Sequence, residues 1–462
     1  MAAELPQALI DSLQTAAGFD EKTFRHVHQA GEQVVSVRLN PVRLPHPGQV
    51  PFLKELLAEK VPWNEYGYYL KERPLFTVDP LFHAGAYYVQ EASSMFLQEA
   101  MQQVCDLSKD LQVLDLCAAP GGKSTLIQSI ISKNSLLVSN EVIKTRAGIL
   151  AENITKWGAA NVVVTNNDPK DFKKLPSFFD CIVIDAPCSG SGMFRKDPDA
   201  ITEWSLNNVE LCSQRQQRIL ADVLGALKPG GTLLYSTCSY SVEEDEMIAD
   251  WLKENYEVSS LRLTTQPEWG IVETVSSKQQ CYGYRFYPGK VRGEGFFIAA
   301  FRKESGKERS VKEKKPAVKN TLPSKAGEKI AAAFLKEADE YKFLQWQNDI
   351  LAVPAAIYEA VLEVQQNMYI KKAGINMGNI IRDELIPSHE LALSSAAAGI
   401  LPQLEVNEAV ALDYLRRKDI QVNTGIRGWA VIKYEGIALG LVKLLANRVN
   451  NYYPKDWRIL NK

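Results

Sequence analysis

Residues 111–125 have the sequence LQVLDLCAAPGGKST, and this stretch decides the class of fold. Its first six residues are a short apolar run typical of a buried strand, followed by a loop of small residues that opens a helical pattern. Four similar runs follow: SLLVSN (135–140), NVVVTN (161–166), DCIVID (180–185) and GTLLYST (231–237). Strands that alternate with helices predict an α/β protein with a parallel sheet covered on both faces. GFFIAAFR (295–302) predicts a late, antiparallel strand.

The length and charge set the number of domains and the class of protein. At 462 residues the chain exceeds one hydrophobic core, and about 150 residues per domain predicts roughly three domains. The net charge of −2 excludes a polybasic protein but still permits a local basic surface that binds nucleic acid. Residues 302–329 carry ten Lys or Arg against four Glu and few apolar side chains, which favours a flexible basic linker over a direct RNA contact.

The cysteine content points to a reducing compartment. Seven cysteines form an odd, sparse set without a CxxC pair, which argues against a disulfide framework and a structural zinc site. The sequence has no long apolar run typical of a membrane span and no secretory signal pattern at its start. We therefore expect a cytoplasmic protein, a monomer, that uses neither a membrane nor a metal.

The glycine loop and three carboxylates predict a ligand site. A P-loop would require Gly where Cys117 stands, and G-x-G-x-x-G is also missing, so phosphate and nicotinamide fingerprints fail. Glu141, Asp168 and Asp185 follow three successive strands, at the sheet edge where ligands of such folds bind. Any one of them could be a solvated turn residue, but the three together favour an adenosine-containing ligand without phosphates.

Two cysteines lie in turns at this same edge. Cys188 in DAPCSGSG (185–192) and Cys238 in YSTCSY (235–240) each follow a predicted strand, flanked by Ser, Gly or Pro. Most lone cysteines are inert small hydrophobes, and Cys105, Cys181, Cys212, Cys281 and Cys117 fit that interpretation. A thiol in an exposed turn near a helix N-terminus has a lowered pKa and can act as a nucleophile.

Five motifs, in order, resemble those of the Sun/RsmB/RsmF/NSUN family of RNA cytosine-5 methyltransferases. They are GAYYVQEASSMF (85–96), LDLCAAPGGKS (114–124), VIDAPCSGSG (183–192), LLYSTCSYSVEEDE (233–246) and RFYPGKVRGEGFFIA (285–299). The resemblance implies a doubly wound, seven-stranded Rossmann-like sheet and transfer of a methyl group from S-adenosyl-L-methionine to RNA. Because cytosine C5 is a weak nucleophile, a thiolate must first add at C6.

The resemblance also implies the site residues. Cys238 is the expected nucleophile, Cys188 assists release, and Asp185 hydrogen-bonds the base. The expected cofactor contacts are Cys117, Ala118, Ala119, Pro120, Gly121, Gly122, Lys123, Glu141, Asp168 and Asp185. Lys123 faces either the cofactor or the RNA, and the sequence does not decide which.

The flanking regions are expected to bind RNA. We predict an N-terminal α+β domain (1–84), a catalytic domain (85–302), a basic linker (303–329) and a C-terminal region (330–462). In the first, Arg38, Arg43, Lys54 and Lys60 with Trp63, Tyr66, Tyr68 and Tyr69 either bind RNA or pack a core, and both interpretations stay open. The last resembles RsmF-type extensions with a PUA-like β-domain. Its basic and aromatic cluster is Lys443, Arg448, Tyr452, Tyr453, Lys455, Trp457 and Arg458.

The predicted function is 5-methylcytosine formation in RNA, with 16S rRNA or the 30S subunit as the substrate. Three alternatives remain: the same chemistry on tRNA, a catalytically silent ribosome assembly factor, and methylation of a protein or small molecule. The pair of intact cysteines argues against the last two.

Overall fold

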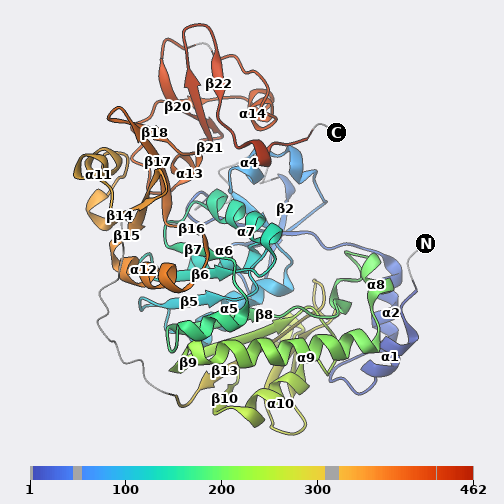
Figure 1. Cartoon of the computed structure of the whole chain (residues 1–462). Helices are drawn as coiled ribbons and strands as arrows, with labels where there is room; N and C mark the ends of the chain where they lie inside the picture. The colour runs from blue at the N-terminus through green and yellow to red at the C-terminus, as the bar shows by residue number, and fades with distance from the viewer. Residues whose placement is uncertain (1–3, 45–54, 307–321, 423, 461–462) are drawn as a thin grey trace.

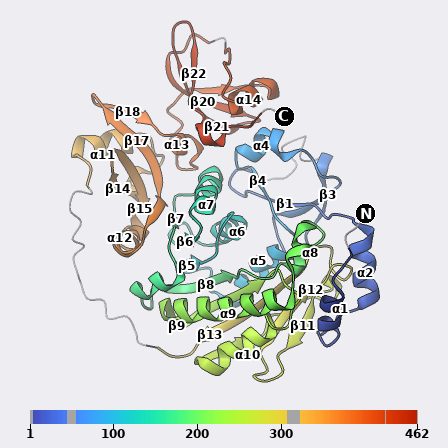
Figure 2. The ribbon, with the colours of Figure 1, turned by 45° about the vertical axis from the view of Figure 1, so that its right-hand side comes forward.

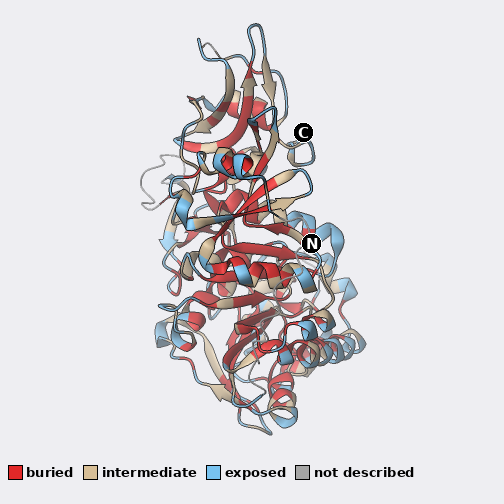
Figure 3. Ribbon diagram, turned by 60° about the vertical axis from the view of Figure 1, so that its left-hand side comes forward, coloured by how far each residue is buried: buried red, intermediate tan, exposed pale blue. Residues whose placement is uncertain are grey.

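The computed structural model describes residues 4–44, 55–306, 322–422 and 424–460. A large central sheet fills the lower half of the molecule in Figure 1, with the two C-terminal sheets above it and the N-terminal elements along one side. Figure 3 shows the buried residues concentrated in the strands and on the helix faces that cover them. The central sheet therefore organises the fold.

The N-terminal region divides into two parts that pack in different places. Helices α1 (Gln7–Leu13) and α2 (Glu21–Ala30) lie beside α8 (Asp199–Glu203), where Leu9, Leu13 and Phe24 share a core with Tyr240 and Tyr287 (Figure 2). The rest forms an antiparallel sheet in the order β2 (Leu57–Lys60), β3 (Gly67–Leu70), β1 (Ser36–Leu39) and β4 (Tyr87–Val89), with the short helix α4 (Pro80–His83).

The central sheet has ten strands. Their order is β11 (Val272–Val275), β12 (Tyr282–Phe286), β13 (Phe296–Lys303), β9 (Leu227–Thr237), β8 (Phe179–Asp185), β5 (Gln112–Asp115), β6 (Leu136–Asn140), β7 (Val162–Thr165) and β16 (Ile370–Ala373), and β10 (Val258–Leu261) pairs with β13. Strands β9, β8, β5, β6 and β7 are parallel, as the five apolar runs predict. Strand β13 is antiparallel to β9, which confirms the expected late strand.

Helices cover both faces of this sheet. One face carries α5 (Leu97–Val104), α6 (Gly122–Ile130) and α7 (Lys144–Trp157), and the other carries α9 (Leu206–Val223), α10 (Glu246–Asn255) and α12 (Tyr358–Asn367). Ser205 begins α9 by accepting a hydrogen bond from the backbone N–H of Asn208. The doubly wound α/β fold is thus confirmed.

The expected count of seven strands is wrong for the whole sheet. Strands β7, β6, β5, β8, β9, β13 and β12 form a continuous set of seven, and β16, β10 and β11 are added to it. Strand β16 comes from the C-terminal region and pairs antiparallel with β7. The edge of β7 offers unpaired backbone groups, and a distant segment that pairs with them removes an exposed edge.

The C-terminal region contains two further sheets of four strands. The first is β14 (Tyr341–Trp346), β15 (Asp349–Pro354), β17 (Ile375–Ile381) and β18 (Glu384–Pro387), with α11 (Lys325–Ala332) and α13 (His389–Leu393). The second is β19 (Gln403–Glu405), β20 (Gly428–Tyr434), β21 (Ile437–Leu444) and β22 (Val449–Asn451), with α14 (Glu408–Leu415).

The two ends of the chain share one hydrophobic core. Leu81 and Ala84 of the N-terminal region lie in the same cluster as Tyr414, Leu439 and Tyr453 of the C-terminal region. The predicted boundaries at residues 84, 302 and 329 stay predictions. Strand β4 begins beyond the first, and most of the basic linker (307–321) lies outside the described residues.

Candidate active site

The carboxyl ends of β5, β6, β8 and β9 meet at one edge of the central sheet. A cavity of about 440 Å³ lies there, and cavities of this size hold small ligands and cofactors. It is lined by Tyr88, Val89, Gln90, Glu91, Ser94, Cys117, Ala118, Ala119, Pro120, Gly122, Lys123, Arg146, Asp185, Met193, Lys196, Cys238, Gly295 and Phe296. Most of the predicted site residues therefore line one cavity.

The glycine loop between β5 and α6 forms one wall. Gly121 has a φ of 121°, a conformation that residues with a side chain rarely adopt, and a Cβ on Gly122 would lie 3.3 Å from the ring of Tyr88. Position 121 therefore needs glycine for its backbone conformation, and glycine at 122 leaves room for the Tyr88 ring to pack close to the loop. Below the loop, Asp115 accepts a hydrogen bond from the Ser124 hydroxyl at 2.7 Å, and burial raises the pKa of Asp115 to about 7.

Two predicted carboxylates do not line the cavity. Glu141 is buried and accepts the backbone N–H of Ile143, with Oε2 at 3.6 Å from a guanidinium nitrogen of Arg146. Asp168 accepts the backbone N–H of Lys170 at the start of a short 3-10 helix. Gly121 and Cys188 are also outside the set of lining residues, although their neighbours Gly122 and Cys238 belong to it.

Lys123 and Asp185 form an ion pair inside the cavity. Lys123 Nζ lies 2.7 Å from Asp185 Oδ2, and the Ser236 hydroxyl donates to Asp185 Oδ1 at 2.9 Å. Burial alone would lower the pKa of Lys123, but the charge of Asp185 and the hydrogen bond to it outweigh this, so the pKa is raised. The pair places a charged donor and a charged acceptor beside Cys238.

The two cysteines meet although 50 residues separate them. Parallel pairing of β8 and β9 brings their following loops together, and Cys188 Sγ lies 2.9 Å from Cys238 Sγ. The hydrogen bond between the thiols and burial raise the pKa of Cys188 well above its usual range. Of the remaining five free cysteines, Cys117 lines the same cavity and the other four lie outside it. The Cys238 sulfur at the cavity wall therefore has a second thiol sulfur directly beside it.

Sequence reasoning missed several residues of the site. Tyr88, Gln90 and Arg146 line the cavity, and Arg146 donates to the carbonyl of Ala119 at 2.8 Å. Arg146 lies in the first turns of the helix that follows Glu141, which could have indicated it. The motif GAYYVQEASSMF (85–96) contains Tyr88 and Gln90, but their place at the cavity depends on how the N-terminal sheet docks.

Most of the predicted basic and aromatic residues of the N-terminal region are buried. In the N-terminal cluster Arg38, Trp63, Tyr68 and Tyr69 are buried, which supports the core-packing alternative, whereas Lys60 is exposed. Arg43 donates to the carbonyls of Lys156 and Leu393, Tyr66 is half-buried, and Lys54 lies outside the described residues.

In the C-terminal cluster only part is exposed. Arg448, Tyr452, Lys455 and Arg458 are exposed, whereas Tyr453 is buried. Lys443 and Trp457 are half-buried. Lys443 Nζ lies 5.3 Å from the ring centroid of Trp429, and that ring lies 4.5 Å from the ring of Tyr452. Trp429 is a further aromatic residue that the sequence reasoning did not single out.

The described residues contain neither a metal-binding cluster nor a membrane-spanning helix. Among them, no group of three or more His, Cys, Asp or Glu is arranged to hold a metal ion. Within the same residues, no helix has the length and apolar character that would let it cross a membrane.

Three family models match the chain. Residues 102–302 match 16S rRNA methyltransferase RsmB/F, residues 402–459 match the methyltransferase RsmF PUA domain, and residues 5–92 match the N-terminal domain of 16S rRNA methyltransferase RsmF. The second match covers the sheet β19–β22 and α14, so the expected PUA-like domain is confirmed.

Relatives and solved structures agree with these matches. The chain is 31% identical to ribosomal RNA small subunit methyltransferase F of Aeromonas salmonicida, covering 91% of this chain and 90% of that protein. It is 29% identical to the protein of the same name from Shewanella piezotolerans, with the same coverage. A methyltransferase homolog from Pyrococcus horikoshii is 28% identical at a TM-score of 0.52, covering 65% of this chain and 100% of that one.

The structure of NSun6 from Pyrococcus horikoshii with SFG shares the fold at 20% identity and a TM-score of 0.54, covering 65% of this chain and 99% of that one. Its fold, together with the matches along 91% of the chain and the cavity where the expected motifs converge, leads to one assignment: the chain belongs to the RsmB/F family of 16S rRNA methyltransferases.

Proposed function

We propose that this protein forms 5-methylcytosine in 16S rRNA, with S-adenosyl-L-methionine as methyl donor and Cys238 as a covalent nucleophile. The observation that carries the proposal is the meeting of Cys188 and Cys238 at 2.9 Å beside the Lys123–Asp185 pair. A methyltransferase for proteins or small molecules would have no use for two adjacent thiols. The names of the relatives favour small-subunit rRNA over tRNA as the substrate.

The cavity fits the proposed donor. Its glycine loop exposes backbone to a ligand, and its volume suits a nucleoside-sized molecule. We assign the loop Cys117–Lys123 to holding S-adenosyl-L-methionine, with Glu141 reaching the ribose and Asp168 the adenine amine. Bound there, this molecule supplies the methyl group that becomes attached to carbon 5 of cytosine. Arg146 lines the same cavity and contacts Glu141, so it supports this end of the site.

Cys238 acts first in the proposed mechanism. Its thiolate adds to C6, and the electron pair of the C5–C6 double bond becomes available to attack the methyl group, whose bond to the sulfonium sulfur would break with its electron pair remaining on that sulfur. Asp185 accepts a hydrogen bond from the base and is itself oriented by Lys123 and Ser236, so negative charge formed during addition lies near a fixed ammonium.

Release then restores the aromatic base. The C5 proton leaves to a base, and the bond between C6 and Cys238 Sγ breaks with its electron pair returning to sulfur. We assign Cys188 to this step because its sulfur is the nearest to Cys238. The target cytosine must leave its stack to reach both thiols, which costs a few kcal/mol. Contacts from the flanking domains can offset that cost, among them Trp429, Tyr452 and Lys443.

The experiment measures label transfer from methyl-labelled S-adenosyl-L-methionine to 30S subunits, naked 16S rRNA and bulk tRNA. We expect Cys238-dependent label on 30S subunits or 16S rRNA. Cys238→Ala should abolish both methylation and the covalent RNA adduct, whereas Cys188→Ala should accumulate the adduct because release stalls. Label on tRNA alone would show that tRNA, not 16S rRNA, is the substrate. Equal behaviour of the two cysteine variants would overturn their assigned roles. No label on any RNA would favour a catalytically silent assembly factor.

A further inference from the structure

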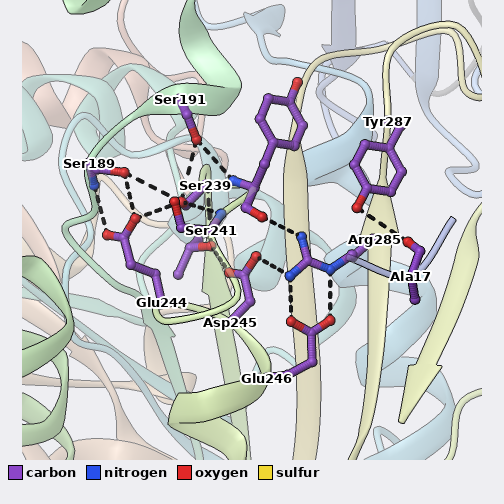
Figure 4. A network of polar contacts seen from close by, with 12 residues as sticks. Ala17, Ser189, Ser191, Ser239, Ser241, Glu244, Asp245, Glu246, Arg285 and Tyr287 are labelled. Carbon is purple, nitrogen blue, oxygen red and sulfur yellow. Dashed lines mark hydrogen bonds and ion pairs between the residues drawn. The ribbon is translucent and has the colours of Figure 1, made fainter. Parts of the chain in front are cut away.

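Both cysteines of the site are followed by a serine, and both serines bind the same buried carboxylate. The Ser189 hydroxyl donates to Glu244 Oε2 at 2.5 Å, and the Ser239 hydroxyl donates to the same oxygen at 2.6 Å. The backbone N–H of Ser189 donates to Glu244 Oε1 at 2.8 Å. Figure 4 shows Glu244 between the two serines, with the loops they belong to on either side. One side chain thus joins the loop of Cys188 to the loop of Cys238.

Glu244 is itself held firmly. It has no exposed surface, and Gln216 of α9 adds a fourth donor to its carboxylate at 3.2 Å. Its backbone carbonyl accepts the hydroxyl of Tyr235 at 2.7 Å, from the strand that leads to Cys238. Glu244 is therefore anchored to α9 through its carboxylate and to β9 through its backbone carbonyl.

We propose that Glu244 is a positioning residue that fixes the two cysteine loops to each other, so that both thiols face the same base. The inference rests on the proposed function, in which one sulfur adds to C6 and the other serves the adjacent C5. Two groups that act in turn on neighbouring ring atoms must keep their relative position through the reaction. Misplacement by about 1 Å costs up to about 100-fold in rate.

The charge of Glu244 supports this role. Burying a carboxylate is costly unless several donors surround it, and burial raises the pKa of Glu244 although its four hydrogen bonds oppose the rise. A neutral side chain could join the loops at less cost. The negative charge of Glu244 also adds to the raised pKa of Cys188, after the hydrogen bond with Cys238 and burial.

Other contacts hold the loops in place when Glu244 is changed. The backbone N–H of Gly192 donates to the carbonyl of Cys238 at 2.8 Å, and that of Tyr240 donates to the Ser191 hydroxyl at 2.9 Å. Arg285 donates to the carbonyl of Tyr240 at 2.7 Å and pairs with Glu246 (Figure 4). A Glu244 variant therefore keeps the fold and loses the precision of the sulfur positions.

The chain offers a matched control. Asp250 is also a buried carboxylate that fixes a loop: it accepts the Ser276 hydroxyl at 2.5 Å and the backbone N–H of Gln279 at 2.7 Å. That loop joins β11 to β12 and does not line the cavity. Asp250→Asn therefore measures the general cost of neutralising a buried, hydrogen-bonded carboxylate in this protein.

The test compares wild type, Glu244→Gln, Glu244→Ala, Asp250→Asn and Cys238→Ala. The first measurement is kcat and KM for methyl transfer to the RNA that wild type labels. The second is the rate at which diamide oxidises Cys188 and Cys238 to a disulfide, followed by peptide mapping, which reports how close the sulfurs are and needs no activity. Thermal melting confirms that each variant is folded.

We expect kcat to fall about 10-fold in Glu244→Gln and about 100-fold in Glu244→Ala, with the KM for S-adenosyl-L-methionine changed less than about 2-fold. The disulfide should form more slowly by similar factors. Asp250→Asn should match wild type in both measurements. If wild type methylates RNA and the Glu244 variants match it, the proposed role of Glu244 is overturned. It is also overturned if Asp250→Asn loses as much activity as they do.

The two proposals fail in different ways. If wild type transfers no label to any RNA, the proposed function is contradicted. The rate of disulfide formation in the Glu244 variants then still tests whether Glu244 positions the two cysteines. A double-mutant cycle adds a further check, because Glu244 acts through Ser189 and Ser239. Ser189→Ala with Ser239→Ala should therefore make Glu244→Ala nearly silent in kcat. If the losses in kcat from the serine and Glu244 substitutions are fully additive, Glu244 does not act through the two serines.

Discussion

The two ends of the chain carry similar mixtures of cations and aromatic rings, and the structure uses them in opposite ways. At the N-terminal end Arg38 and Trp63 are buried. At the C-terminal end Tyr452 is 43% exposed and lies against Trp429, with Lys443 over the indole ring. The first set holds domains together, and the second leaves several of its cations and rings on the surface.

The difference comes from what covers each sheet. Strand β1 is an inner strand of the N-terminal sheet, and its Arg38 reaches the first turn of α6, where it donates to Thr125 Oγ1 at 2.6 Å. Strand β20 has a face on which Trp429 is only half-buried. Composition alone therefore does not separate an RNA-binding cluster from a domain interface, because burial depends on partners distant in sequence.

The largest expected effect is the loss of stability when Trp63 is replaced. Its indole N–H donates to the carbonyl of Ala92 at 2.7 Å, and its ring packs edge-on against Phe96 and Phe286. We expect Trp63→Ala to lower the free energy of unfolding by about 3–5 kcal/mol, because a large buried ring leaves a cavity. Urea unfolding measures this, with Trp429→Ala as the control that changes it by less than about 1 kcal/mol. Equal losses in the two variants would contradict the comparison.

Much of the central sheet could be predicted from sequence, and the reason is local. Strands β5 to β9 are short apolar runs between helical patterns. Each can therefore be predicted from its own residues, without knowing which strands it pairs with. Strand β16 could not be predicted as part of this sheet, since its partner β7 lies about 200 residues earlier.

The residues of the site also differ in how far they could be predicted from sequence. Cys188, Cys238, Lys123 and Asp185 lie within recognisable motifs. The structure places Cys238, Lys123 and Asp185 at one cavity wall, with Cys188 directly behind Cys238. Glu244 was missed because its donors are spread along the chain: Ser239 lies 5 residues away, Gln216 28 and Ser189 55. The signal was present in the repeated Cys-Ser pair, but its meaning requires the contact between the loops.

The next largest expected loss of stability follows from replacing Arg38. It is a buried guanidinium with neutral partners, among them Gln90 Oε1 at 2.9 Å and the carbonyl of Gly122, and burial lowers its pKa to about 9. We expect Arg38→Ala to cost about 2–3 kcal/mol of unfolding free energy and to raise the KM for S-adenosyl-L-methionine, because the start of α6 loses its support.

Arg38→Met is the matched control for volume and should cost about 1 kcal/mol less, since it refills the space without burying a charge. Urea unfolding and initial-rate kinetics measure both variants. A variant that unfolds like wild type but binds RNA more weakly would show that Arg38 is a surface contact, and the contrast between the two clusters would then disappear.

A smaller effect is expected at Trp429 and Tyr452. If these rings stack on unpaired bases, each alanine substitution should weaken RNA binding by about 1–3 kcal/mol while the protein melts as wild type does. Fluorescence anisotropy with labelled 16S rRNA fragments measures the affinity. Tyr66→Ala serves as the N-terminal counterpart, and we expect it to leave RNA affinity unchanged. Weaker binding in Tyr66→Ala alone would reverse the roles of the two ends.

The smallest effect concerns the salt dependence of RNA binding. Lys443 and Arg448 lie on β21 and in the turn before β22, on the same domain as Trp429. A cation that contacts a phosphate contributes about 0.7–0.9 to the slope of log affinity against log salt. Lys443→Gln and Arg448→Gln should each lower the slope by about that amount, whereas Lys133→Gln should not, because Lys133 pairs with Glu340 at 2.7 Å. A slope that falls only in Lys133→Gln would place the RNA beside Lys133 instead and leave the C-terminal rings without a ligand.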